Sequence, residues 1–376
     1  MSWLSRLAER QIQKARLKGE LQGLEGEGKP LPERPGDAFV SAGDAAGWLL
    51  RQGFEVHETG PDRSWAMAEL ARQWPERQGL SGAEQVGELG PRLFAGVYAP
   101  ATLQPLRVLL QQWRPGCLVH DVMAHAAPLA AALEGVRSVS HGFGLPRPRH
   151  SIEGAVARMA LQWQAQGLEM PPDSGNHRGG HVDICPPSMR LDEPVPAGPR
   201  WPLSPTSGVK RRQGARQGVL ASFGTVHHHQ ATFDRLLAVL MRGPWPARAA
   251  LGKPPDPGQA WPSHLHAAAW LDLAAEWAAC RVGACHGGAG TMLGALAQGV
   301  PLLLLPVAAD QFRNARALQA VGAGIALQGD AQTESGMRHA LERLHDEPAF
   351  TDAALRMADE LAAMPQAEDV ARALLR

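Results

Sequence analysis

The chain has 376 residues, of which 44% are apolar and 20% are charged. This length is too great for one ordinary core and suits two domains. Lys+Arg and Asp+Glu both total 37, so the net charge excludes a global electrostatic attraction to nucleic acid or to an anionic membrane.

Cysteine usage and the apolar runs point to a cytoplasmic protein. The four cysteines form neither a zinc pattern nor a dense disulfide framework, as expected in a reducing compartment. The most apolar run, "VPLLLLPVAA", is far shorter than the roughly 18 residues that span a bilayer. The amino terminus is charged and lacks the apolar core of a secretory signal. We therefore expect no integral membrane segment and no bound metal.

Residues 1–47 begin with a helical pattern. Leu4, Leu7 and Ile12 recur at near-helical spacing among charged side chains. The stretch "GLEGEGKPLPERPGD" then ends this helix with glycine and proline.

Residues 48–187 alternate helical stretches with short apolar strands. The segments "CLVHDV" (117–122) and "VRSVSHG" (136–142) read as strands, and the alanine-rich stretch between them reads as a helix that ends at a glycine. This spacing predicts a βαβ unit. Residues 188–216 are rich in proline and basic residues, which favours an interdomain linker over a nucleic-acid-binding segment.

Residues 217–376 show a second alternation. Strands are predicted in "GVLASFGTV", "HLHAAAW", "RVGAC" and "PLLLLPV", with helices between them and over 335–375. The simplest architecture that explains both alternations is two doubly wound α/β domains joined by a linker. In such a pair the ligand lies in the cleft, at the carboxyl ends of the strands.

The stretch "ACHGGAGTMLGALAQGVP" (284–301) carries the clearest chemical signal. Glycines let backbone N–H groups approach a ligand, and the amino terminus of the following helix presents partial positive charge, so the turn suits a phosphate group. The Walker and dinucleotide patterns are both absent. His286 adds a donor or a positive charge. The alternative is a tight turn that only packs a strand against a helix.

The wider sequence resembles the family 1 glycosyltransferases, in particular the bacterial branch that glycosylates natural products and sterols. The stretch "HGGAGTMLGALAQGVPLLLLPVAADQFRNARALQAVGAGIAL" is similar to the donor-sugar motif of that family. The resemblance starts near residue 48 and also covers "CLVHDVMAHAAPLAAALEGVRSVSHGFG", "VDICPPSMR" and "GVLASFGTV". It implies the GT-B fold, with two Rossmann-like domains facing a cleft, a nucleotide-sugar donor as co-substrate, no cofactor and no metal.

The resemblance also implies roles for individual residues. The sugar would be bound by Asp310 and Gln311, and Trp270 would stack on the nucleobase. The donor diphosphate would be held by His286, Gly287, Gly288, Ala289, Gly290, Thr291 and Thr225. Three of these have simpler alternatives: Trp270 as an interdomain core residue, Asp310 as a helix cap and Thr225 as a loop cap.

Two departures from the family leave the nucleotide open. The segment "AWLDL" stands where the family usually continues its tryptophan with proline and glutamine. Gly294 stands where plant relatives carry a glutamate that holds the ribose. The donor is therefore expected to be either a UDP-hexose or a TDP-hexose.

The amino-terminal segment of the chain departs further from the glycosyltransferase family. Residues 1–47 resemble the start of a domain of unknown function linked to DnaJ-like proteins, with its "GKPL" signature. Compared with the family it resembles, the glycosyltransferase domain is then expected to lack its first strand, first helix and second strand, together with the loop histidine that acts as base in that family. His57 is the only histidine in the first 60 residues and does not align with that base.

Another histidine is therefore needed as the proton acceptor. Among His120, His125 and His141, the best candidate is His125, with Asp121 orienting its ring. The alternative is that His125 only begins a helix.

The resemblance thus implies an inverting, metal-independent hexosyltransferase that acts on a hydroxyl of a small hydrophobic acceptor held by the amino-terminal domain. The alternative is a catalytically impaired protein, from a fused or truncated gene, that binds nucleotide-sugar without transferring it. A third hypothesis is a chaperone-associated adaptor that binds a protein partner through residues 1–47.

Overall fold

The computed structural model describes residues 38–42, 55–76, 87–191, 198–209, 211, 214–224, 229–256 and 258–374. The chain divides into two compact units. Unit 1 comprises Met1–Asp183 and Glu193–Trp201, and unit 2 comprises Ile184–Asp192 and Pro202–Arg376. The predicted linker, 188–216, thus contributes residues to both units. The helix expected near the start of the chain lies outside the described residues.

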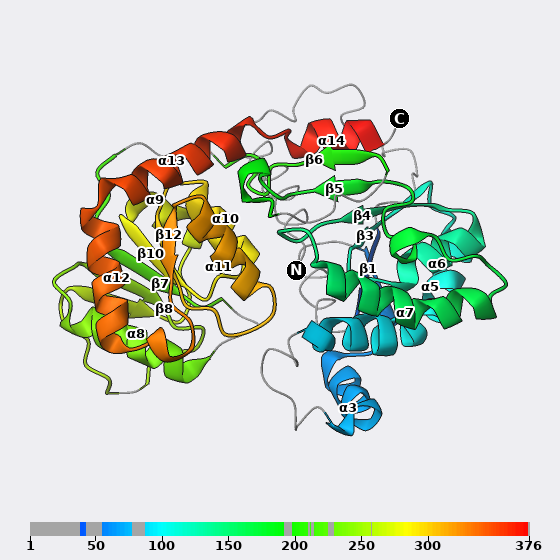
Figure 1. The fold of residues 1–376 in the computed structure, drawn as a ribbon, viewed down its shortest axis with the longest axis horizontal. Helices are drawn as coiled ribbons and strands as arrows, with labels where there is room; N and C mark the ends of the chain where they lie inside the picture. Colours follow the sequence, from blue (N-terminus) through cyan, green and yellow to red (C-terminus); the bar gives the residue numbers. More distant parts are fainter. Residues whose placement is uncertain are drawn as a thin grey trace, which may run out of the picture. The chain divides into compact units, whose positions relative to one another are not determined.

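Unit 1 is built on a four-stranded sheet in the order β3-β4-β5-β6 (Figure 1). Its strands are β3 (Cys117–Asp121), β4 (Arg137–His141), β5 (His181–Asp183) and β6 (Arg200–Pro202). Strands β3 and β4 are parallel and are joined by helix α6 (Ala126–Glu134). The predicted βαβ unit is therefore confirmed.

The remaining helices of unit 1 pack against this βαβ unit and against each other. They are α3 (Arg63–Gln73), the π-helix η2 (Pro91–Tyr98), α5 (Ala99–Trp113), α7 (Arg149–Ala165) and the 3-10 helix η3 (Pro172–Gly175). Helix α5 packs on α6, where Leu106 and Leu110 meet Leu118 of β3. By length and composition alone, the stretch Gly87–Trp113 could cross a membrane. Here it forms η2 and α5, and its buried side chains line the core of unit 1.

Two further strands precede α3. Strand β1 (Ala38–Ala42) pairs in parallel with β2 (Glu55–Gly60) in a two-stranded sheet of their own. Within the segment 1–47, expected to be helical, the described residues 38–42 thus form a strand. In the described part of the chain β3 is the outer strand of the four-stranded sheet, and its Val119 is 46% exposed.

Unit 2 contains a six-stranded sheet in the order β12-β11-β10-β7-β8-β9, in which all neighbouring strands are parallel. Its strands are β7 (Val219–Ser222), β8 (Ala247–Ala250), β9 (Leu265–Ala268), β10 (Val282–Cys285), β11 (Leu302–Leu304) and β12 (Gly324–Ala326). Four of them lie where the sequence predicts strands. β8 and β12 were not predicted, because "ARAA" and "GIA" carry almost no β-branched or aromatic residues.

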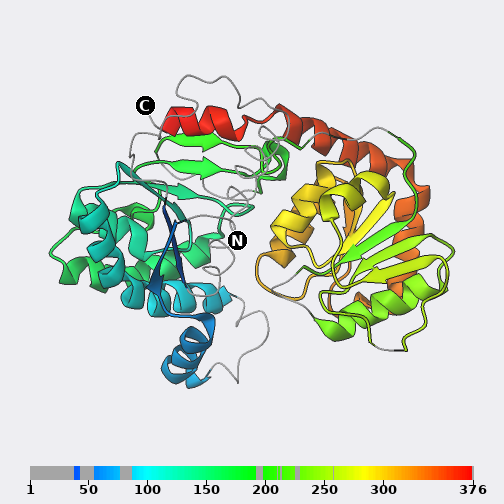
Figure 2. The ribbon, with the colours of Figure 1, turned by 180° about the vertical axis from the view of Figure 1, so that it is seen from behind.

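Helices cover both faces of this sheet (Figures 1 and 2). Helices α8 and α12 pack together on one face, and α9, α10 and α11 lie on the other. Phe233, Leu236 and Leu240 of α8 recur on one side of the helix and are buried in the core. The α-helices of unit 2 are α8 (Gln230–Arg242), α9 (Leu273–Ala279), α10 (Ala289–Leu296), α11 (Gln311–Ala320), α12 (Glu334–Asp346), α13 (Pro348–Ala363) and α14 (Ala367–Leu374). The same unit contains the 3-10 helices η4 (Pro187–Met189) and η5 (Gly329–Ala331).

The strand order places a topological switch between β7 and β10. From β7 the chain adds β8 and β9 on one side, then returns to add β10 and β11 on the other. The register pairs Cys285, the last residue of β10, with Ser222 of β7 and Leu304 of β11. The loops that follow these three strands therefore begin side by side, at the edge where doubly wound sheets bind ligands.

Helix α7 offers a matched test of the core of unit 1. Met159 is fully buried against Trp163, whereas Leu161, two residues further on, is 72% exposed. We expect Met159→Ala to lower the free energy of unfolding by about 2–5 kcal/mol, because it removes buried methylenes and leaves a cavity. Leu161→Ala should change it by less than about 0.5 kcal/mol. Denaturant unfolding checks both, and equal effects would contradict this packing.

Candidate functional site

The glycine-rich turn of unit 2 follows directly from β10. Gly287 has φ +87°, a left-handed conformation that side chains rarely adopt. Gly288 returns to φ −62° and ψ 137° and is the N-cap of α10. Two successive glycines thus turn the chain from the buried strand into the helix within three residues.

The imidazole of His286 is packed between two glycines. A Cβ atom on Gly224, in the loop after β7, would lie 3.0 Å from Cε1 of His286. A Cβ atom on Gly288 would lie 2.6 Å from Nε2. The ring centroid is 6.0 Å from that of Phe223, and His286 is 7% exposed. His286 therefore joins the loops after β7 and β10 at the switch point, and both neighbouring positions require glycine.

The amino terminus of α10 faces open space. Gly290 is exposed, and a Cβ atom on it would meet nothing within 4 Å. The N-cap is a glycine, so no side chain caps the first turn, and Ala289 is buried while Thr291 is half-buried. An uncapped helix amino terminus with accessible backbone suits an anion. The turn is thus accessible rather than sealed under packed side chains.

The loop after β11 carries Asp310 and Gln311. Oε1 of Gln311 accepts hydrogen bonds from the backbone N–H groups of Val307 and Ala308, at 2.8 and 2.9 Å. Gln311 is only 1% exposed. Its amide therefore holds the loop in shape. Asp310 stands at the N-cap position of α11, but its side chain makes no capping hydrogen bond to that helix.

Asn314 was not among the predicted site residues, and the structure places it at the centre of this site. Its Nδ2 donates to the carbonyl of Gly287 at 2.8 Å and to Oδ2 of Asp310 at 2.8 Å. Asn314 is fully buried. The signal was present in "DQFRNA", because a spacing of four residues on a helix places Asn314 beside Asp310.

Trp270 lies just beyond β9 and is 65% exposed. The preceding segment is fixed by backbone hydrogen bonds from Leu251 to Ala268 and from Gly252 to Ala269. Asp272 then caps α9 through the N–H of Ala274. An indole exposed at the carboxyl edge of the sheet suits stacking on a planar group. Thr225 lies outside the described residues.

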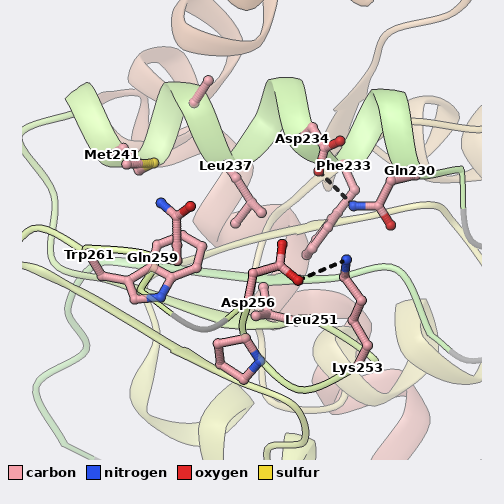
Figure 3. A pocket seen from close by; sticks show the side chains of 12 residues that line it. Gln230, Phe233, Asp234, Leu237, Met241, Leu251, Lys253, Asp256, Gln259 and Trp261 are labelled. Atoms are coloured by element: carbon pink, nitrogen blue, oxygen red, sulfur yellow. Dashed lines mark hydrogen bonds and ion pairs between the residues drawn. The ribbon is translucent and has the colours of Figure 1, made fainter.

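A cavity of about 210 Å³ opens in unit 2 between α8 and the segment 251–261 (Figure 3). Phe233, Leu237 and Met241 form part of its apolar wall. Four of its polar side chains form two pairs: Lys253 with Asp256 at 3.8 Å, and Gln230 with Asp234 at 2.6 Å. None of the predicted donor-site residues lines it. The open amino terminus of α10 is therefore the better candidate for the donor diphosphate.

In unit 1 the structure corrects the expected pair of His125 and Asp121. His125 is 1% exposed, and its nitrogens lie 3.4 Å from Nδ2 of Asn176 and 3.5 Å from an Nη of Arg147. The Asp121 carboxylate instead accepts the N–H of Met123 at 2.7 Å. Burial, with the charge of Arg147, lowers the pKa of His125 to about 3. His125 is thus a neutral, enclosed ring that Asp121 does not orient.

His125 belongs to a larger buried polar cluster. Arg147 pairs with Asp173 at 2.7 Å, and His177 also bonds to Asp173. Burial acts to raise the pKa of Asp173, but His177 and Arg147 together lower it, which keeps the carboxylate ionised. Within the described residues, no group of three or more His, Cys, Asp or Glu side chains is placed to hold a metal ion.

Family comparisons identify both units and the front segment. Residues 88–199 match the family described as "Erythromycin biosynthesis protein CIII-like, N-terminal domain", and residues 255–376 match its C-terminal counterpart. Residues 7–55 match "DnaJ homologue, subfamily C, member 28, conserved domain". Both predicted resemblances are confirmed, and the DnaJ-related match extends eight residues beyond the predicted boundary at 47.

Individual relatives support the same family assignment. Elloramycin glycosyltransferase ElmGT of Streptomyces olivaceus is 33% identical over 284 residues, or 72% of this chain and 71% of that protein. L-demethylnoviosyl transferase of Streptomyces niveus is 30% identical over 314 residues, or 78% of each. The solved structure of Spinosyn Rhamnosyltransferase SpnG complexed with thymidine diphosphate is 21% identical, with a TM-score of 0.71 over 90% of this chain and 92% of that one.

Two α/β units with parallel sheets and this structural neighbour confirm the expected GT-B fold class. With the sequence relatives, they show that the chain belongs to the family 1 glycosyltransferases.

The two glycines around α10 give a matched pair of variants. We expect Gly288→Ala to destabilise unit 2, because its new Cβ would clash with Nε2 of His286 although its φ and ψ suit any residue. Gly290→Ala should be neutral or stabilising by up to about 1 kcal/mol, since alanine favours the helix and nothing opposes its methyl group. Thermal unfolding compares them. Equal stability would show that His286 is not confined as described.

The buried histidines of unit 1 predict acid sensitivity. Burial lowers the pKa of His120 and His141 to about 4 and that of His125 to about 3, against an ordinary value of 6.5. The unfolded chain therefore binds more protons between about pH 6.5 and 4, and stability falls as the pH falls through this window. Denaturant unfolding at pH 7 and pH 5 measures the loss. His141→Gln should reduce it, and a pH-independent stability would contradict the burial of these rings.

Proposed function

We propose that this protein transfers a hexose from a nucleoside-diphosphate sugar to a hydroxyl group of a small hydrophobic acceptor, with inversion and without a metal ion. One observation supports this most directly: the open amino terminus of α10, with its exposed Gly290, lies at the topological switch beside the loop that carries Asp310. A site for a diphosphate and a carboxylate for sugar hydroxyls are thus neighbours in one unit.

In the proposed reaction, the acceptor oxygen attacks the anomeric carbon while the bond from that carbon to the diphosphate oxygen breaks. The leaving diphosphate gains negative charge as this bond breaks. The backbone N–H groups at the start of α10 and the donor His286 would stabilise that charge, which favours the transition state over the bound donor. The acceptor proton must pass to a base.

The nucleotide is proposed to be thymidine diphosphate or uridine diphosphate. Thymidine diphosphate is the nucleotide in the SpnG complex, which shares the fold. Trp270, 65% exposed at the end of β9, would stack on the pyrimidine. Gly294 on α10 offers no side chain to a ribose hydroxyl, so any selection between the two nucleotides depends on other residues.

A second candidate function is nucleotide-sugar binding without transfer, and the histidines of unit 1 favour it. His57, the only histidine of the first 60 residues, lies on β2 and bonds to Glu55 at 3.0 Å. His125 is enclosed. A positioned general base typically contributes about 10²–10⁴ in rate. The two candidates differ in one assay: incubation with TDP- or UDP-glucose and a phenolic or sterol acceptor yields glycoside only if transfer occurs.

Replacement of His286 tests the placement of the diphosphate. We expect His286→Ala to weaken binding of TDP and UDP about 10- to 100-fold, because a hydrogen bond to a charged group contributes about 1.5–3 kcal/mol. Isothermal titration calorimetry measures this without any need for turnover.

The matched control is His339→Ala, which removes an exposed histidine from α12 of the same unit. Its affinity should equal that of the unchanged protein. If His286→Ala binds both nucleotides as tightly as the control, the diphosphate does not bind at this turn.

A further inference from the structure

The side chain of Asn314 links the two loops of the proposed donor site. Gly287 follows β10, and Asp310 follows β11, so the pairing of these strands brings the two loops to one edge of the sheet but does not itself orient the Asp310 carboxylate. Asn314 bonds to both: Nδ2 lies 2.8 Å from the Gly287 carbonyl and 2.8 Å from Oδ2 of Asp310. One buried amide therefore bridges the turn and the carboxylate.

Only one orientation of this amide fits. An NH₂ group has two hydrogens, which match the two acceptors. The reversed amide would place its oxygen against a carbonyl oxygen and a carboxylate. In the orientation found, Oδ1 of Asn314 is buried without a hydrogen-bond partner. An unsatisfied buried oxygen is unfavourable, and the two donor bonds offset this cost in the orientation found.

We infer that Asn314 is a positioning residue of the donor site, which holds the Asp310 carboxylate in register with the diphosphate-binding turn. This inference rests on the proposed function. The sugar and the diphosphate of a donor are joined by a single bond to the anomeric carbon, so the groups that bind them must keep a fixed separation. A misplacement of about 1 Å at a reacting centre can lower the rate about 10²-fold.

The isosteric variant Asn314→Asp tests this role through a pH profile. It replaces the NH₂ group with an oxygen that faces Oδ2 of Asp310, so two carboxylates repel each other. We expect kcat/KM for the nucleotide sugar to fall about 10- to 100-fold at pH 8. Between pH 8 and pH 5.5 it should partly recover, because two adjacent carboxyl groups retain one proton and that proton restores a hydrogen bond. Asn314→Ala should be impaired at every pH.

The unchanged protein and Asn314→Ala are measured over the same pH range. Their profiles show how the titration of other groups, such as His286, Asp310 and the acceptor, changes kcat/KM, so that this contribution can be subtracted. If Asn314→Asp follows the same profile as Asn314→Ala, the inference is wrong.

A double-mutant cycle separates positioning from general packing. If Asn314 acts through Asp310, Asn314→Ala should lower kcat/KM less than about threefold further in an Asp310→Ala background. If Asn314 is only a buried structural residue, the two losses in kcat/KM multiply. Multiplied losses would overturn the inference.

A third readout does not depend on any donor. Hydrogen exchange of the backbone over residues 286–291 should be faster in Asn314→Ala than in Gln319→Ala, which alters an exposed residue of the same helix. Equal exchange in the two variants would overturn the inference. Should the protein bind neither TDP nor UDP, the proposed function fails, and this measurement still decides whether Asn314 fixes the turn.

Discussion

The parallel register of β10 between β7 and β11 is the constraint on which the proposed donor site depends. Because Cys285 pairs with both Ser222 and Leu304, three loops from distant parts of the sequence start at one level of the sheet. A shift of one residue would turn every side chain of the strand to the opposite face and separate the loops. The chemistry proposed for the glycine turn thus follows from backbone pairing before any side chain is considered.

Above that edge, small and amide residues set the loop positions. Gly224 and Gly288 leave room for the imidazole of His286, while Gln311 and Asn314 satisfy backbone and carboxylate groups through buried amides. Neutral amides form these bonds without bringing a buried charge next to an anionic ligand. The site therefore combines a rigid polar framework with an accessible helix end.

The sequence predicted most of the fold and suggested residues for a candidate site, but it gave no indication of how those residues bond to one another. Long periodic helices such as α8 and apolar strands such as β11 carry strong local signals, whereas β8 and β12 are strands only because the sheet pairs them. The glycines of the turn were recognisable by residue type. The role of Asn314 depends on contacts between loops, and the burial of His125 depends on Arg147 and Asn176, which lie far along the chain.

The outer edge of β3 has a consequence for how the protein behaves in solution. In the described part of the chain this strand has a paired neighbour on one side only, and Val119 is 46% exposed there, with the exposed Asp121 two residues further along the same strand. Exposed apolar strand edges promote intermolecular pairing, which natural proteins usually prevent with charges or prolines. The exposed Asp121 carboxylate is a charge of this kind, so it should oppose self-association of concentrated preparations through this edge of unit 1.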